Sequence, residues 1–384
     1  MDPATPPETL QQLSEDLDTY TRVKVGENEK TPLSALQKLC KDEDIYVREA
    51  VAKNPSATPE MLEELLNHPL AQKDTKDPLA EDKSIIAKAV VENPKTPAKI
   101  LAKLSSENPE IVAGIAAHPN TPIEILQQLS KHKDIQVREK IAENPNTPQE
   151  TLLGMIDDES EWIRASIAKN PKTPLLYLDK LSNDKSDKVK RSCLESKRKW
   201  AKKTDLTSQE IDSLANDQDP LVRSSMASHQ NISELTLQIL SKDSDSSVRE
   251  AVAGNPKTPR YILDGMAEDA SSLVKDKVAA NPKTSPEKLE ILSKEGGDRK
   301  RWVGQNPSTP EKILVWLSFE RNKSIRESVA KNIKTPQGAL AKLLLDEDSE
   351  VRKAASQNPR TPPKQMAVEK AKEFIQQWQE SLKQ

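Results

Sequence analysis

The residues best suited to binding another molecule lie in one short basic segment, residues 185–203. This segment has nine lysines and arginines and only two acids, which gives it a charge of +7 in a chain whose net charge is −3. Clustered positive charge attracts nucleic acids and acidic protein surfaces. We predict that a negatively charged partner, an acidic protein or a nucleic acid, contacts Lys197, Arg198, Lys199, Trp200, Lys202 and Lys203. Trp200 can stack on a base or ring. The alternative is a solvated loop that joins two halves of the molecule.

A second set of basic residues recurs along the chain at intervals of about 26 residues. Its members are Arg22, Arg48, Arg138, Arg164, Lys190, Arg223, Arg249, Lys275, Lys300, Arg326 and Arg352. One interpretation is a basic stripe for phosphates. The other is a structural ladder, in which each base pairs with the Asp four residues earlier, as in Asp44 and Arg48, or reaches the next repeat. Because acids accompany these bases and the net charge is negative, we predict the structural ladder.

Sites for catalysis, metals or cofactors are not indicated. The sequence has no GxGxxG, GxxxxGK[ST] or HExxH motif. The stretch Asp243-x-Asp245-x-Ser247 begins like a calcium loop, but it has Val248 where the loop needs Gly and Gly254 where it needs Glu. None of the four histidines has metal-ligand spacing; they are His68, His118, His132 and His229. We therefore predict no catalytic residue, no metal site and no cofactor.

The cysteines and the apolar runs indicate a cytoplasmic protein. Cys40 and Cys193 are the only cysteines and outline neither a disulfide framework nor a metal site. The longest apolar run, residues 313–317, is far shorter than the ~20 residues of a membrane helix. No secretory signal is visible at the N-terminus. We expect no membrane partner and a location in the cytoplasm.

The elements that position these residues follow from an internal repeat. The string VREAVAKNP at residues 47–55 returns as VREKIAENP at 137–145 and VREAVAGNP at 248–256. Its Asn marks fourteen anchor positions, and two of the gaps, of 39 and 33 residues, exceed the usual 26 by 13 and 7 residues. A fixed period of this length is typical of a solenoid. The anchors are Asp2, Asn28, Asn54, Asn93, His118, Asn144, Asn170, Ser196, His229, Asn255, Asn281, Asn306, Asn332 and Asn358.

Each repeat predicts two short helices. A cap residue ten positions before the anchor starts the first helix, and apolar residues such as Val137 and Ile141 mark its buried face. We expect the anchor Asn to bond backbone groups of its own turn. A Thr-Pro pair follows, whose Thr is expected to cap the second helix with Pro at its first position. Leucines such as Leu126 and Leu129 then mark a second buried face.

Leucine-rich repeats that form strands are excluded, because their L-x-L alternation is replaced here by spacings of three and four. The pattern V-R-x-x-V-A-x-N-P-x-T-P-x-x-x-L-x-x-L resembles the leucine-rich repeat variant family, which is HEAT-like in shape. The resemblance implies an all-α, right-handed superhelical solenoid of about fourteen 26-residue two-helix repeats. Some members carry a cysteine-ligated iron–sulfur module, for which this chain has too few cysteines.

The predicted organisation is one solenoid over residues 1–366, followed by a capping helix over residues 367–384. Insertions are expected near 68–82 and 197–206. An apolar stripe on an otherwise polar terminal helix suits the end of a solenoid. Its members are Val368, Ala371, Ile375, Trp378 and Leu382.

A fold that consists mainly of extended surface, without a catalytic motif, predicts a non-enzymatic scaffold that binds another protein. The alternative is a nucleic-acid-binding protein or an enzyme similar to the HEAT-like DNA glycosylases. Such a protein would act through the basic segment 185–203 and a concave face.

Overall fold

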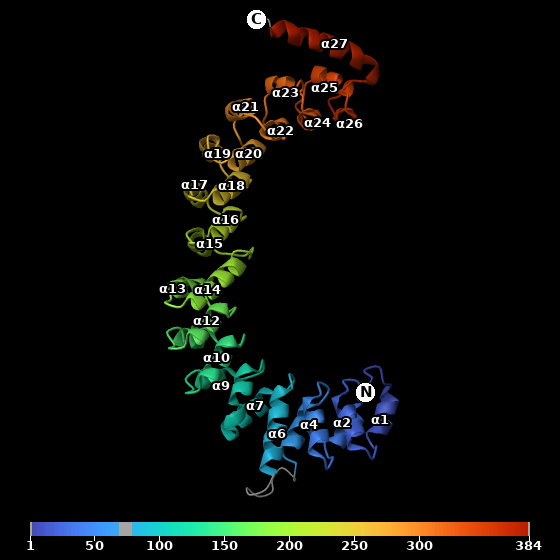
Figure 1. The fold of residues 1–384 in the computed structure, drawn as a ribbon, viewed down its shortest axis with the longest axis vertical. Coiled ribbons are helices and arrows are strands. Elements are labelled where there is room, and N and C mark those ends of the chain that lie inside the picture. The colour runs from blue at the N-terminus through green and yellow to red at the C-terminus, as the bar shows by residue number, and fades with distance from the viewer. Residues whose placement is uncertain (1, 69–78, 383–384) are drawn as a thin grey trace. The chain divides into compact units, whose positions relative to one another are not determined.

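The structure is a computed structural model that describes residues 2–68 and 79–382 (Figure 1). Regular secondary structure in these residues is helical, as predicted. The first helices of the repeats are α2 (Thr19–Glu27), α4 (Ile45–Lys53), α6 (Leu79–Glu92), α8 (Val112–Ala117), α10 (Ile135–Glu143), α12 (Glu161–Lys169), α14 (Asp187–Trp200), α16 (Pro220–Ala227), α18 (Ser246–Gly254), α20 (Ser272–Ala280), α22 (Arg299–Gln305), α24 (Lys323–Lys331) and α26 (Ser349–Gln357).

The second helices alternate with them along the chain. They are α1 (Pro7–Leu13), α3 (Leu33–Leu39), α5 (Pro59–Leu66), α7 (Ala98–Glu107), α9 (Ile123–Leu129), α11 (Gln149–Gly154), α13 (Leu175–Ser182), α15 (Ser208–Ala215), α17 (Glu234–Leu240), α19 (Arg260–Met266), α21 (Pro286–Lys294), α23 (Glu311–Leu317), α25 (Gln337–Leu344) and α27 (Lys364–Ser381). A short 3-10 helix, η2 (Pro109–Ile111), precedes α8.

The chain divides into two compact units, Met1–Ser196 and Lys197–Gln384, and the boundary falls within α14. In each unit consecutive first helices pack side by side, for example α2 on α4 and α10 on α12, or α16 on α18 and α18 on α20. We call these rows the first-helix layer. The prediction of an all-α solenoid of helix pairs is confirmed, and the right-handed superhelix stays a prediction.

The predicted apolar stripes form the core. Val137 and Ile141 of α10 are buried, as are Leu126 and Leu129 of α9. A helix of two turns is not stable alone in water, so each repeat depends on the burial of its stripe against its neighbours.

Most of the first helices are capped as predicted. The carboxylate of Asp134 accepts a hydrogen bond from the Gln136 backbone N–H at 2.9 Å. The prediction that Thr of the Thr-Pro pair caps the second helix is wrong for most repeats. Thr147 instead donates its hydroxyl hydrogen bond, at 2.6 Å, to the carbonyl of Ile141 in the preceding helix. It thereby satisfies one of the orphan carbonyls at the end of that helix.

The C-terminal helix α27 begins at Lys364, three residues before the predicted start, and packs on α25. Phe374 and Trp378 both stack with Phe319, with ring centroids 5.8 and 5.0 Å apart. Gly338 of α25 permits this approach, because a Cβ atom there would lie only 2.7 Å from the Phe374 ring. Residues 69–78, in the insertion predicted near 68–82, lie outside the described part of the chain.

Candidate functional site

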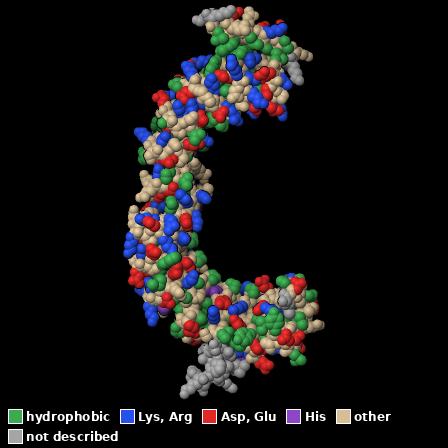
Figure 2. All heavy atoms as spheres, in the orientation of Figure 1, with side chains coloured by type: hydrophobic (Ala, Val, Ile, Leu, Met, Phe, Trp, Pro, Cys, Tyr) green, Lys and Arg blue, Asp and Glu red, His purple; other side chains and the backbone are tan. Residues whose placement is uncertain are grey.

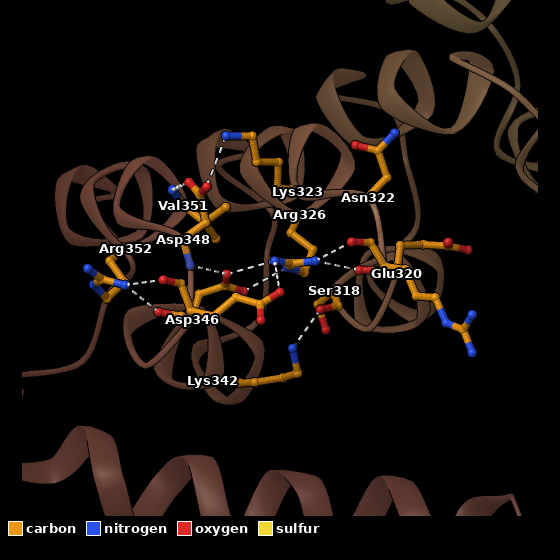
Figure 3. A network of polar contacts seen from close by, with 12 residues as sticks. Ser318, Glu320, Asn322, Lys323, Arg326, Lys342, Asp346, Asp348, Val351 and Arg352 are labelled. Atoms are coloured by element: carbon orange, nitrogen blue, oxygen red, sulfur yellow. Dashed lines mark hydrogen bonds and ion pairs between the residues drawn. The ribbon is translucent and has the colours of Figure 1, made fainter.

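The recurring bases form ion pairs between neighbouring repeats. In Arg164, Nε and Nη2 donate to the carboxylate of Asp184 at 2.7 and 3.0 Å. Its Nη1 donates to the backbone carbonyls of Asp158 and Glu159 at 2.6 and 3.1 Å. Arg326 makes the same contacts with Asp346 and two carbonyls (Figure 3). Each guanidinium therefore connects the start of its own helix to the following repeat.

We call this set of interactions the ion-pair ladder. In every pair the acid lies 20 residues after the base. The pairs are Arg22–Asp42, Arg138–Asp158, Arg164–Asp184, Arg223–Asp243, Arg249–Asp269 and Arg326–Asp346, with Lys275–Glu295 and Lys300–Glu320 as lysine versions.

The predicted structural ladder is confirmed, and these pairs follow the second of its two predicted forms, in which the base reaches the next repeat. The Asp four residues earlier caps its own helix, and the base instead reaches the acid of the next repeat. The hydrogen bond from Arg164 holds the pKa of the Asp184 carboxyl below its usual value, although burial opposes this shift. A buried, paired base is not available to nucleic-acid phosphates.

The anchor Asn residues form a second ladder. Nδ2 of Asn332 donates to the carbonyls of Gly304 and Asn306 in the preceding repeat, at 2.8 and 2.9 Å. Its Oδ1 accepts from the backbone N–H of Lys334 at 2.9 Å. The predicted bond to its own turn is thus present, and sequence reasoning missed the two bonds to the neighbouring repeat.

The histidines at anchor positions have the same structural role. Nε2 of His118 lies 2.9 Å from the carbonyl of Asn93. Nε2 of His229 lies 3.1 Å from the carbonyl of Lys203. Lys203 therefore occupies the anchor position of the repeat with the seven-residue insertion, which we call the irregular repeat. The repeat spacing in the sequence had predicted Ser196 at this position.

Five of the seven extra residues of this repeat lengthen its first helix. Helix α14 has 14 residues, whereas α12 and α18 each have nine. Seven residues make about two helical turns, so the added turns keep the same face toward the core. Of the insertion predicted near 197–206, residues 197–200 lie within α14 and residues 201–206 follow its end.

Lys197 belongs to the ion-pair ladder and not to the predicted contact surface. Its ammonium lies 2.6 Å from the carboxylate of Asp217, 20 residues later, and the two side chains are only 6% and 7% exposed. Lys197 is therefore the base of this repeat that pairs with an acid of the following repeat. The repeat spacing in the sequence had predicted Lys190 for this position.

The other basic residues predicted at this place remain on the surface. Arg198, Lys199, Lys202 and Lys203 are exposed and Trp200 is half-buried. Arg198 donates to Asp219 at 2.8 Å, and the Lys203 ammonium lies 3.3 Å from the centre of the Trp200 ring. In the described part of the chain, Lys199 and Lys202 form no ion pair. We call Arg198, Lys199, Lys202 and Lys203 the α14 basic surface; blue side chains gather around α14 in Figure 2.

The described residues contain no group of three or more His, Cys, Asp or Glu side chains placed to hold a metal ion. Within residues 2–68 and 79–382, no helix has the length and apolar character to span a membrane. Cys40 and Cys193 are buried and do not form a disulfide with each other. Burial raises the pKa of the Cys40 thiol to about 12, which makes it a poor nucleophile.

Known structures resemble the chain only distantly. "A leucine-rich repeat variant with a novel repetitive protein structural motif" is 20% identical, covering 59% of this chain and 87% of that chain with a TM-score of 0.41. An engineered protein is 17% identical over 97% and 99% of the two chains, with a TM-score of 0.28. A structure of the Pds5–Scc1 complex is 14% identical over 90% and 70%, with a TM-score of 0.29.

The comparison with curated proteins gave no match. Among family models, that of the Leucine Rich Repeat Variant domain matches residues 86–144. This segment contains the anchors Asn93, His118 and Asn144, the end of α6 and the helices α7 to α10. The resemblance predicted from the repeat pattern is confirmed for residues 86–144, which match the model of the Leucine Rich Repeat Variant domain.

Proposed function

We propose that this chain is a non-enzymatic scaffold that holds an acidic partner protein on the α14 basic surface. The observation that supports the proposal is the contrast between two kinds of base. Ladder bases such as Arg164 are buried and paired, whereas Lys199 and Lys202 are exposed without an ion pair in the described chain. Exposed charge that the fold does not use can steer a partner of opposite charge. The two buried cysteines, which form no disulfide with each other, support a reducing setting such as the cytoplasm.

The tryptophans support a protein partner over a nucleic acid or a glycosylase-type reaction. A glycosylase-type site needs a carboxylate beside exposed tryptophans. Here cations lie against the rings: Lys203 on Trp200, Lys188 on Trp162, and Lys300, which also pairs with Glu320, at 4.5 Å from the centre of Trp316. With net charge −3, the rest of the chain also repels a long polyanion.

The test compares two variants that each remove two charges. We expect Lys199→Gln/Lys202→Gln to weaken binding of a protein partner, recovered from nuclease-treated host extract, by about tenfold. The loss should lie mainly in the association rate and should shrink with added salt. The control is Lys131→Gln/Lys133→Gln, at exposed positions in the other unit. Equal affinity of the two variants, or recovery of nucleic acid alone, would contradict the proposal.

A further inference from the structure

A groove lies on the first-helix layer of the unit that contains the α14 basic surface. Its volume is about 520 Å³, and it extends over α16, α18 and α20. Its floor is made of small side chains, and one base stands at its far side. The residues used below are Ser225, Ser228, Glu250, Ala251, Gly254 and Lys277.

The repeat explains why the groove lies beside the basic surface. The positions four and one before each anchor lie on the same exposed part of the first-helix layer. They are Lys199 on α14 and Lys202 in the turn after it, Ser225 on α16 and Ser228 at its C-cap, Ala251 and Gly254 on α18, and Lys277 and Ala280 on α20. The two helices in the middle therefore present small residues, with lysines on both flanks.

Most other helices of the layer have a large or charged side chain at one or both of these positions; α8 has the small pair Gly114 and Ala117, but its neighbours α6 and α10 do not. The same two positions hold Lys140 and Glu143 on α10, and Trp302 and Gln305 on α22. The ammonium of Lys140 lies 2.8 Å from Glu143, so charged side chains occupy this part of the layer there.

The net charge of the groove and its flanks is positive. Glu250 is the acidic residue that lines the groove, and its carboxylate lies 3.7 Å from the Lys277 ammonium. The stem of Lys277 passes over Gly254, where a Cβ atom would lie 3.8 Å from its Cδ. Lys199 and Lys202 remain as positive charge that no acid of the described chain balances.

We propose that this groove holds an extended acidic segment of the partner protein, running from Lys199 and Lys202 to Lys277. This inference rests on the proposed function. Small floor residues let the main chain of an extended peptide approach the helices, and lysines at both ends favour acidic side chains there. Three repeat spacings of about 8–10 Å span about 24–30 Å, which about eight extended residues cover.

The experiment measures binding of labelled oligoglutamate peptides of four, eight and twelve residues to the full chain. We expect affinity to rise about tenfold from four to eight residues and to change little from eight to twelve. Gly254→Gln fills the groove without changing the charge and should weaken binding of the eight-residue peptide about fivefold. The matched control is Gly265→Gln on α19 of the same repeat, where a side chain meets open space; it should leave binding unchanged.

The outcomes separate this inference from the proposed function. If Lys199→Gln/Lys202→Gln weakens partner and peptide binding but Gly254→Gln does not, the groove is not the site and the inference fails alone. If neither variant has an effect, both fail. The inference is also overturned if affinity keeps rising beyond eight residues, or if an eight-nucleotide single strand binds more tightly than the peptide.

Discussion

Replacing Arg164 with methionine is expected to lower the free energy of unfolding of the N-terminal unit by about 3 kcal/mol. The change keeps most of the apolar stem but removes the guanidinium. The carboxylate of Asp184, whose side chain is 10% exposed, then loses its partner, and two backbone carbonyls lose their donor. A buried group left without its partner costs more than a surface pair contributes. Urea denaturation followed by circular dichroism measures the effect.

The control for this variant is Arg260→Met, which removes an exposed pair with Glu287 and should cost less than about 1 kcal/mol. The pH dependence gives a second check. Since Arg164 lowers the pKa of Asp184, the pair stabilises the fold above the unfolded pKa of about 4 and this contribution is lost as pH falls through the lowered folded value. The difference between wild type and Arg164→Met should therefore shrink in acid. A stability difference between wild type and Arg164→Met that does not change with pH would contradict the stabilising role of the Arg164–Asp184 pair.

Replacing Asn332 with alanine is expected to cost about 2–3 kcal/mol in the C-terminal unit. The side chain is buried, and its loss leaves the carbonyls of Gly304 and Asn306 without their amide donor. Asn216→Ala is the control, because the side-chain amide of this exposed Asn donates to the carbonyl of Asp212 in its own repeat and not to a neighbouring repeat. It should change stability by less than about 0.5 kcal/mol. Similar losses in both variants would show that the anchor ladder does not hold the repeats together.

The helices could be predicted from the sequence because each repeat contains the local signals of its own two helices. Val137 and Ile141 lie four residues apart, which is sufficient to indicate one helix face. The partner of each ladder base could not be chosen in the same way. Asp42 and Asp44 both precede Arg48 closely in the sequence, and local helix geometry favours a pair between Asp44 and Arg48, which are four residues apart. Only the stacking of repeats shows that a base such as Arg164 meets the acid 20 residues later.

The irregular repeat was misaligned for a geometric reason. Its extra seven residues equal about two turns, so Val189 and Cys193 still fall on a buried face with or without the insertion. The spacing of 26 from Asn170 therefore pointed to Ser196 as the anchor. The bond between His229 and the Lys203 carbonyl, which depends on the neighbouring repeat, shows the actual register.

Helix α14 contains two kinds of base: Lys197 is buried in the ion-pair ladder, and Lys199 is exposed on the α14 basic surface. Thermal unfolding of Lys197→Gln and Lys199→Gln, recorded side by side, tests this difference most directly. Lys197 is buried against Asp217, so its loss should lower the Tm by about 4 °C or more. Lys199 is exposed, and its loss should shift the Tm by about 1 °C at most. Equal shifts, or a larger shift for Lys199→Gln, would contradict this division.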